Sequence, residues 1–421
     1  MTADALAELA DPSALREWLA AGLDVGCGER VIVGVRAGGR VAIAAAGEQG
    51  VTDTACDAPM PIGCLAKLFT AALVMQARAA GRLGLDDPVA ERLPSGAGIE
   101  LRGITLRHLL EHTHGLDDSL LERAPRCEDG RIDARRLVAA LAAAPRLAAP
   151  GEIYSYSNAG AWLLAAVLET AAGLAYARLL HDELLAPLGV AAGVRCSASG
   201  GGEICPAVGG ALAVRVRGLL ELVGAHAPCD GDAGAGTPLP GWHPLERGCR
   251  LGWKVHAPGW LGHQSAWPNA SALVRVHPRA GVALAVCSTG PAAAVVAARV
   301  LGARLPELAA LRVPRLLDVG SAEASAAKRG EGLYRTARYA VSVAAGAGGG
   351  LVLRTAARTG GRYRPAARAS LCPAEHGVCF TRPALAEFPY VQLVSPCAAG
   401  YRFIWNGRFV LPRREDSARR A

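Results

Sequence analysis

Four short β-rich runs lie at the two ends of a long helical stretch, and this spacing constrains the fold more than any other feature. Two runs, 30 to 36 and 40 to 47, flank the turn sequence Ala-Gly-Gly and predict a hairpin. Two more follow at 270 to 278 and 281 to 288. Because each run must bury an apolar face, the simplest packing joins all four in one antiparallel sheet. We therefore expect an α/β (α+β) fold, an antiparallel β-sheet flanked by helices with a helical subdomain beside it.

Helix formers and hydrophobic periodicity predict helices before, between and after these strands. The expected ranges are 4 to 22, 64 to 80, 105 to 112, 132 to 143, 159 to 171, 174 to 185, 211 to 225 and 291 to 303. The Gly- and Pro-rich stretch 227 to 250 is too long for a passive connection, so we expect it to border a substrate cleft.

The chain of 421 residues exceeds one typical domain. A Pro-punctuated, charged stretch at 304 to 328 separates two parts of different pattern. Residues 1 to 310 are predicted to form the catalytic domain, and residues 329 to 412 a small C-terminal β domain.

Composition argues against several classes of protein. The net charge is +8, but the basic residues are scattered without a dense run interleaved with aromatics, so nucleic acid is not expected as a partner. No apolar run reaches the ~18 residues of a membrane span, and the first residues lack the pattern of an export signal. We expect a soluble cytoplasmic protein that binds no membrane. The twelve cysteines include no C-x-x-C pair, so neither a disulfide framework nor a metal or cofactor site is expected.

Cys64 and Lys67 carry the clearest chemical signal. They are three residues apart at a predicted helix start, so they lie one turn apart on the same face. A thiol titrates near ~8.5, and both a helix N-terminus and a neighbouring ammonium favour the reactive thiolate. In this arrangement Lys67 can act as an electrostatic activator of a Cys64 nucleophile.

The surrounding sequence, PMPIGCLAKLFTAALVMQARAAGRLGLDDP, resembles the S-x-x-K helix of penicillin-binding proteins and class C β-lactamases, with cysteine at the serine position. ITLRHLLEHTHGL at 104 to 116 resembles the helix and turn that follow. Tyr156-Ser157-Asn158 matches the Y-x-N element, and GWLGHQSAW matches the third motif around His263. The elements occur in family order across roughly residues 25 to 303.

The resemblance implies a β-lactamase/transpeptidase-like fold and a role for each matched residue. Tyr156 would be the proton shuttle beside Cys64, and Asn158 would bind the substrate amide while touching Lys67. His263 would face the substrate. The backbone amides of Cys64 and Ala266 are the expected oxyanion hole, because backbone donors stabilise the tetrahedral intermediate.

Gln264 and Ser265 follow His263 in the third motif, where the family usually ends the triplet in glycine. They are candidate substrate-binding residues, and the bulk of Ser265 argues against β-lactam hydrolysis. The small-residue entrance at 208 to 223 also lacks the polar and acidic residues usual in the family.

Other interpretations of these residues stay open. Cys64 alone would be a small buried hydrophobe, or the site could be decayed or carry an engineered exchange of serine. His263 could be hydrogen-bonded filler. His108 and His112, four residues apart, could mimic a metal pair, but without a third ligand a structural role is favoured. Trp253 and Lys254 could line the cleft or belong to the core or surface.

The expected reaction is acyl transfer through a Cys64 thioester, from an ester or thioester donor to an amine or alcohol. Thioesters react with amines more readily, relative to water, than oxygen esters do, so cysteine favours a transacylase. The partners are a small-molecule acyl donor, which could be carrier-linked, and an amine or alcohol acceptor in natural-product biosynthesis. An esterase or amidase on the same fold is the second candidate, and a non-catalytic binding protein the third.

Overall fold

The computed structural model describes most of the chain. The described residues are 7–22, 30–47, 50–52, 56–94, 101–121, 124–129, 131–190, 194–196, 207, 212–228, 237–238, 248–267, 269–290, 327–346, 350–360, 362–374, 378–385, 388, 390–397, 400–406 and 408–414. The helix expected at 291 to 303 and most of the stretch 227 to 250 lie outside them.

A nine-stranded antiparallel sheet joins the first and last strands of the catalytic part. Its order is β3 (Gly50–Thr52), β2 (Arg40–Gly47), β1 (Arg30–Ala37), β12 (Val282–Thr289), β11 (Ala270–His277), β10 (Trp260–Trp267), β9 (Trp253–Ala257), β8 (Gly248–Arg250), β7 (Thr237–Pro238). Arg30 pairs with Thr289 and Ala37 with Val282, so the hairpin formed early in the chain lies directly beside the late one. The single antiparallel sheet predicted from the four β-rich runs is confirmed.

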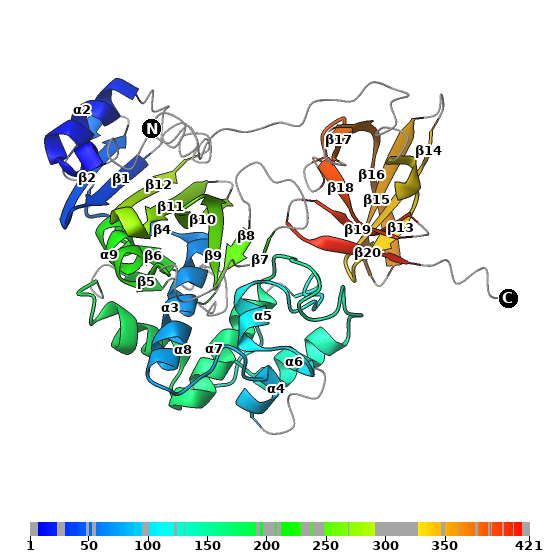
Figure 1. The fold of residues 1–421 in the computed structure, drawn as a ribbon, viewed down its shortest axis with the longest axis horizontal. Helices are drawn as coiled ribbons and strands as arrows, with labels where there is room; N and C mark the ends of the chain where they lie inside the picture. Colours follow the sequence, from blue (N-terminus) through cyan, green and yellow to red (C-terminus); the bar gives the residue numbers. More distant parts are fainter. Residues whose placement is uncertain are drawn as a thin grey trace.

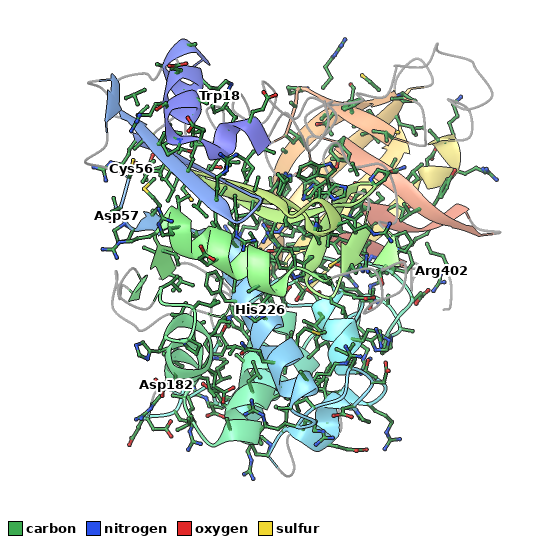
Figure 2. All side chains as sticks on the ribbon, turned by 60° about the vertical axis from the view of Figure 1, so that its left-hand side comes forward. Trp18, Cys56, Asp57, Asp182, His226 and Arg402 are labelled. Atoms are coloured by element: carbon green, nitrogen blue, oxygen red, sulfur yellow. The ribbon has the colours of Figure 1, made fainter. Side chains whose placement is uncertain are left out.

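Helices cover both faces of this sheet (Figures 1 and 2). Val31, Val33 and Val35 of β1 pack against α2 (Pro12–Gly22), whereas Ile32 points into the core on the other face. Helix α9 (Val216–His226) covers that second face. Gly34 permits its close approach, because a Cβ at this position would lie 2.6 Å from a methyl carbon of Val216.

The helical subdomain packs beside the sheet and surrounds α3 (Ala66–Ala79), which is buried along most of its length. The other elements are α4 (Val89–Arg92), α5 (Leu106–Leu110), α6 (Ala134–Ala142), α7 (Ala159–Ala172), α8 (Tyr176–Leu179) and the π-helix η4 (Leu180–Leu185). Helix α7 contacts α3, α5 and α6, so it organises the subdomain.

Some predicted helices differ from the structure. The range 211 to 225 contains a strand, β6 (Leu212–Val214), before α9, because this segment pairs with β4 (Met60–Pro61) and β5 (Val194–Cys196). The predicted helix at 4 to 22 is divided into the 3-10 turn η1 (Glu8–Ala10) and α2, with Asp11 capping the amides of Ser13 and Ala14. The predicted helix at 174 to 185 changes to π geometry at Leu180.

The C-terminal part is a closed antiparallel barrel that begins after η8 (Lys328–Gly330). Its strands in order are β13 (Gly332–Arg335), β14 (Tyr339–Ala345), β15 (Leu351–Thr359), β16 (Arg362–Pro373), β17 (Val378–Arg382), β18 (Tyr390–Cys397), β19 (Gly400–Trp405) and β20 (Val410–Arg414). Pairing of Leu333 with Arg414 closes the ring. Buried side chains such as Tyr334, Leu353 and Ile404 fill the interior.

The barrel contacts the helical subdomain through a small apolar cluster. Figure 1 shows the barrel beside the rest of the chain. Phe403, Trp405 and Val410 of the barrel pack with Leu147 and Ile153, which precede α7. The contact therefore reaches the segment that carries the Y-x-N element.

Within the described residues, no single helix combines the length and hydropathy needed to cross a membrane. Helices α7 and α8 with η4 meet those criteria only when taken together, across a bend of 80°.

Candidate active site

Cys64 lies in the 3-10 turn η2 (Gly63–Leu65), directly before α3. The α-helix expected from residue 64 thus begins two residues later, at Ala66. Gly63 adopts a φ of 51°, which a residue with a side chain rarely takes, so glycine makes the turn into Cys64 possible. Lys67 then follows in the first turn of α3, three residues after the thiol as predicted.

Lys67 is buried, and its Nζ donates a hydrogen bond to Oδ1 of Asn158 across 2.8 Å. The same Nζ lies 4.9 Å from the ring centroid of Tyr156. The Y-x-N residues and the lysine therefore meet as the resemblance implies.

Asp118 holds the Tyr156-Ser157-Asn158 turn in place. Its Oδ2 accepts hydrogen bonds from the Ser157 hydroxyl at 2.8 Å, the Asn158 amide at 2.8 Å and the Ala159 amide at 3.0 Å. These donors lie at the start of α7, where a carboxylate is favoured by the helix dipole. Asp118 was not predicted, because it lies outside the segments that match the family motifs.

The electrostatics favour an ionised sulfur. Burial alone would raise the pKa of the Cys64 thiol, but the charge of Lys67, the Tyr156 hydroxyl and the charges of Arg408 and Lys254 together lower it below its ordinary value. Burial also lowers the pKa of the Lys67 ammonium, against the opposing charge of Cys64. The neighbouring cations and the Tyr156 hydroxyl thus favour the ionised form of Cys64.

Tyr156 has the opposite tendency. Its hydroxyl is buried without a well-aligned hydrogen bond among the described residues, and burial followed by the charge of Cys64 raises the pKa of the phenol well above its usual value. At neutral pH Tyr156 is therefore a neutral phenol. Hydrogen bonds of catalytic groups are often poorly aligned before substrate binds.

The third motif lies on β10, which runs beside η2. The His263 ring centroid is 6.2 Å from that of Tyr156, so His263 joins the cluster. The Ser265 hydroxyl donates to the Ile62 carbonyl across 2.9 Å and fastens β10 to the turn before Cys64. The backbone of Ala266 continues this strand and pairs with Ser271.

Gln264 does not join the cluster. Side chains alternate along a strand, and its Oε1 accepts a hydrogen bond from the buried guanidinium of Arg275 on β11. The structure thus places Gln264 on the face of β10 away from His263 and Ser265. The motif match could not give this orientation to the middle residue of the triplet.

Two further residues reach the site: His112, for which the sequence favoured a structural role, and Arg408, which no motif indicated. His112 adopts a φ of 57° after α5, and its ring centroid lies 4.6 Å from that of Tyr156. Its Nδ1 accepts a hydrogen bond from the Ser157 amide, and burial lowers the pKa of its imidazole well below the usual value, which keeps it neutral. Arg408, in the turn between β19 and β20, lies over the Tyr156 ring at 5.5 Å from its centroid.

The predicted histidine pair therefore separates into two roles. His108 accepts a hydrogen bond from the Thr105 amide and caps α5, whereas His112 faces Tyr156. In the part of the chain that is described, no three His, Cys, Asp or Glu side chains form a group that could hold a metal ion.

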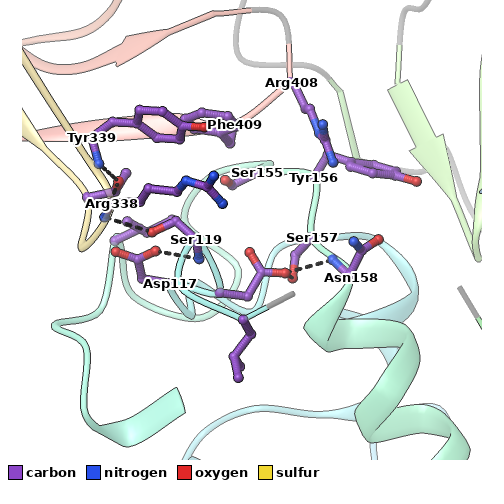
Figure 3. A pocket seen from close by; sticks show the side chains of 14 residues that line it. Asp117, Ser119, Ser155, Tyr156, Ser157, Asn158, Arg338, Tyr339, Arg408 and Phe409 are labelled. Carbon is purple, nitrogen blue, oxygen red and sulfur yellow. Dashed lines mark hydrogen bonds between the residues drawn. The ribbon is translucent and has the colours of Figure 1, made fainter. Parts of the chain in front are cut away.

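A cavity of about 410 Å³ opens between the barrel and the Y-x-N segment (Figure 3). One wall carries Ser155, Tyr156 and Asn158, and the other carries Arg338, Tyr339, Arg408 and Phe409. The rings of Tyr339 and Phe409 stack with their centroids 5.8 Å apart. The barrel thus forms part of the cleft beside the predicted proton shuttle.

Comparison with known proteins found a β-lactamase family model and penicillin-binding proteins. The family model described as Beta-lactamase matches residues 26–192. Penicillin-binding protein 4* of Bacillus subtilis (strain 168) is 32% identical over 132 residues, 31% of this chain and 29% of the Bacillus protein. The chain therefore spans less than a third of that relative. Penicillin-binding protein 4 of Amycolatopsis lactamdurans is 27% identical over 308 residues, 62% of this chain and 80% of that protein.

The chain is therefore similar to the serine β-lactamase and penicillin-binding-protein-like superfamily, as the motifs predicted. Members of this superfamily are enzymes, mostly hydrolases and carboxypeptidases. A crystal structure of SurE with D-Leu is similar over nearly the whole molecule, with a TM-score of 0.71 and 26% identity over 98% of this chain and 100% of SurE. That likeness extends to the C-terminal barrel. The β-lactamase/transpeptidase-like fold expected from the sequence is confirmed.

Proposed function

We propose that the protein is an acyltransferase that works through a thioester on Cys64. The observation that carries the proposal is the environment of the Cys64 sulfur. Burial raises the pKa of this thiol, but the charge of Lys67, the Tyr156 hydroxyl and the charges of Arg408 and Lys254 together lower it. A thiolate is the attacking form of cysteine. Its lysine and tyrosine neighbours occupy the positions expected for this family.

In the first half-reaction the Cys64 thiolate attacks the carbonyl carbon of an ester or thioester donor. The carbonyl π electrons move to oxygen, and the backbone amides of Cys64 and Ala266 are the proposed donors to this oxyanion. When the tetrahedral intermediate collapses, the bond to the leaving group breaks and Tyr156 gives that group its proton. The products are the Cys64 thioester and the released alcohol or thiol.

In the second half-reaction an amine or alcohol attacks the thioester carbonyl. The Tyr156 phenolate takes the proton of the attacking group, and the carbon–sulfur bond breaks to release amide or ester. Cys64 returns as thiolate and Tyr156 as phenol, so every proton is accounted for. During both steps the Lys67 ammonium offsets the negative charge of the sulfur and the oxyanion. Asn158 binds the substrate amide.

Three considerations support, in turn, transfer over hydrolysis, the kind of substrate and the biological setting. A thioester reacts with amines in preference to water more strongly than an oxygen ester does. SurE, which matches this chain along its whole length, was crystallised with D-Leu, so we propose an amino acid residue in the donor or acceptor. We propose natural-product biosynthesis in the cytoplasm as the setting, since a reducing compartment keeps Cys64 as a thiol.

Product partition tests this function. The full chain is incubated with a peptidyl thioester that mimics a carrier-linked donor, with and without D-leucinamide, and products are separated by liquid chromatography and mass spectrometry. We expect new amide with the amine present, and its loss in Cys64→Ala. Cys64→Ser should form more free acid relative to amide, because its acyl-enzyme is an oxygen ester.

Two outcomes contradict the proposal in different ways. Free acid as the sole product, at any amine concentration, identifies an esterase or amidase in which water is the second nucleophile. No product and no adduct on Cys64 with several activated donors identifies a binding protein on the same fold.

A further inference from the structure

Lys254 is a second buried lysine at the active site, on a different element from Lys67. It lies on β9, where it pairs with Gly262 of β10, the residue before His263. Its side chain is buried, with an exposed fraction of 3% for the residue. The sequence leaves two interpretations of Lys254 open, a residue that lines the cleft and a residue of the core or surface.

The ammonium of Lys254 contacts two tyrosines of the segment before α7. Its Nζ donates a hydrogen bond to the Tyr154 hydroxyl. The same nitrogen lies 4.7 Å from the ring centroid of Tyr154 and 4.8 Å from that of Tyr156. Lys67 lies 4.9 Å from the same Tyr156 ring, so two ammonium groups share one aromatic side chain beside the nucleophile.

A buried cation must be compensated for the water it loses. Aromatic faces and a phenolic oxygen supply part of this compensation, and the effect of a cation over a ring grows when water is excluded. A lysine that served packing alone would be replaceable by a neutral side chain of similar length. The proposed reaction forms two anions beside Lys254, first the Cys64 thiolate and then the tetrahedral oxyanion. Attraction to these anions offsets part of the cost of burying the Lys254 ammonium.

The charged and titratable groups around this position come from six other elements or segments. They are Cys64 of η2, Lys67 of α3, His112 after α5, Tyr154 and Tyr156 before α7, His263 of β10 and Arg408 of the barrel. Burial holds His112 neutral, so its imidazole does not supply the positive charge. The cations that act on Cys64 are Lys67, Arg408 and Lys254.

We propose that Lys254 is a positioning residue that, through Tyr154 and Tyr156, supplies the second ammonium charge that stabilises the anionic sulfur of Cys64. The role rests on Cys64 being the nucleophile of the proposed function. The proposal gives the two lysines different functions. Lys67 binds Asn158 directly, while Lys254 fixes the tyrosine pair and raises the positive potential around the sulfur.

The test is the pH dependence of Cys64 alkylation, which needs no substrate. The full chain is treated briefly with iodoacetamide from pH 5 to pH 10, and alkylation at Cys64 is followed by peptide mapping, which separates it from the other cysteines. Lys254→Met removes the charge at similar length. Lys254→Gln removes the charge but keeps a donor for Tyr154, and Lys254→Arg keeps the charge.

We expect both neutral variants to raise the midpoint of the Cys64 profile by about one pH unit, whereas Lys254→Arg stays near the wild type. Should Lys254→Met fail to fold, Lys254→Gln decides the question. A neutral, folded variant with the wild-type midpoint overturns the role of Lys254, even if its melting temperature falls. A wild-type midpoint at or above the ~8.5 of an ordinary thiol would instead count against the proposed nucleophile itself.

Discussion

The backbone amide of Tyr156 donates a hydrogen bond to the carbonyl oxygen of Arg408 across 2.8 Å. The predicted proton shuttle is thereby tied to the turn between β19 and β20 of the barrel. A second tie lies one residue earlier, where the amide of Val410 donates to the Ser155 hydroxyl across 3.2 Å. The barrel therefore contributes directly to the structure of the candidate active site.

Replacing Ser155 with alanine should weaken this link. The variant leaves the buried Val410 amide without its acceptor, which costs about 1 to 3 kcal/mol. We expect a lower free energy of unfolding in urea and slower acylation of Cys64. Ser119→Ala is the matched control, because its hydroxyl accepts from the Arg338 amide at an exposed contact with the barrel. Equal stability of the Ser155 and Ser119 variants would refute the assigned importance of the inner link.

Asp118→Asn should slow acylation more than it lowers stability. Asparagine keeps an acceptor oxygen for the three donors at the start of α7 but loses the charge that strengthens those bonds. A loss of about 1.5 to 3 kcal/mol in the transition state corresponds to roughly 10- to 100-fold in the rate constant. The rate is measured with an activated thioester in stopped flow.

Asp86→Asn provides the comparison for this variant. Asp86 pairs with Arg107 at the surface, where ion pairs contribute little, so its rate should match the wild type. If both variants acylate at the wild-type rate, Asp118 does not position the Y-x-N turn.

The fold was largely predictable because its signals are local and repeated. Hydrophobic runs at 30 to 47 and 270 to 288 predicted the sheet, and helix formers from 64 to 80 predicted α3 with an error of two residues at its start. The strand β6 was missed because pairing with β4 and β5, rather than its own sequence, determines its conformation. The closed form of the C-terminal barrel likewise depends on pairing between β13 and β20, at its two ends.

The site was predictable only where a motif names the residue. Cys64, Lys67, Tyr156, Asn158 and His263 come together as the resemblance implied, while their catalytic roles stay predictions. Arg408 and Asp118 reach the same cluster from outside the matched motifs, so spacing gave no signal for them, and the position of Lys254 just before the third motif left its role open. The strained backbone of His112 is visible only in three dimensions.

Lys67→Met should slow acylation of Cys64 by about 1,000-fold or more, because members of a catalytic unit act together. Loss of the Lys67 charge raises the pKa of Cys64, so less thiolate is present. Loss of the hydrogen bond to Asn158 leaves the side chain of this substrate-binding residue less well positioned. In the double variant Lys67→Met/Cys64→Ser, the fold loss in acylation rate should be far smaller than the product of the losses in the two single variants. A Lys67→Met variant that retains most of its acylation rate would remove this lysine from the mechanism.

His114 should make the fold less stable in mild acid. Burial lowers the pKa of His114 from 6.5 to about 4, so between these values the unfolded chain binds more protons than the folded chain. Stability is thus fully present above pH 6.5 and is lost as the pH falls toward 4, by on the order of 3 kcal/mol for this group.

Urea unfolding at pH 7 and pH 4.5 measures this loss. His114→Asn keeps an acceptor for the Leu116 amide, which Nδ1 of His114 now binds, but cannot take up the proton. The variant should lose less stability than the wild type over the same interval. Identical losses in the two proteins would exclude His114 as the source.

The central claim is that Cys64 carries the acyl group, and intact-mass analysis measures it directly. The wild type is mixed with a peptidyl thioester, quenched in acid within the first turnover, and the adduct is located by peptide mapping. The account predicts a mass increase of one acyl group on Cys64, removed when an amine is added before the quench, and no adduct in Cys64→Ala. Turnover by Cys64→Ala at the wild-type rate, or an adduct mapped to another residue, would contradict it.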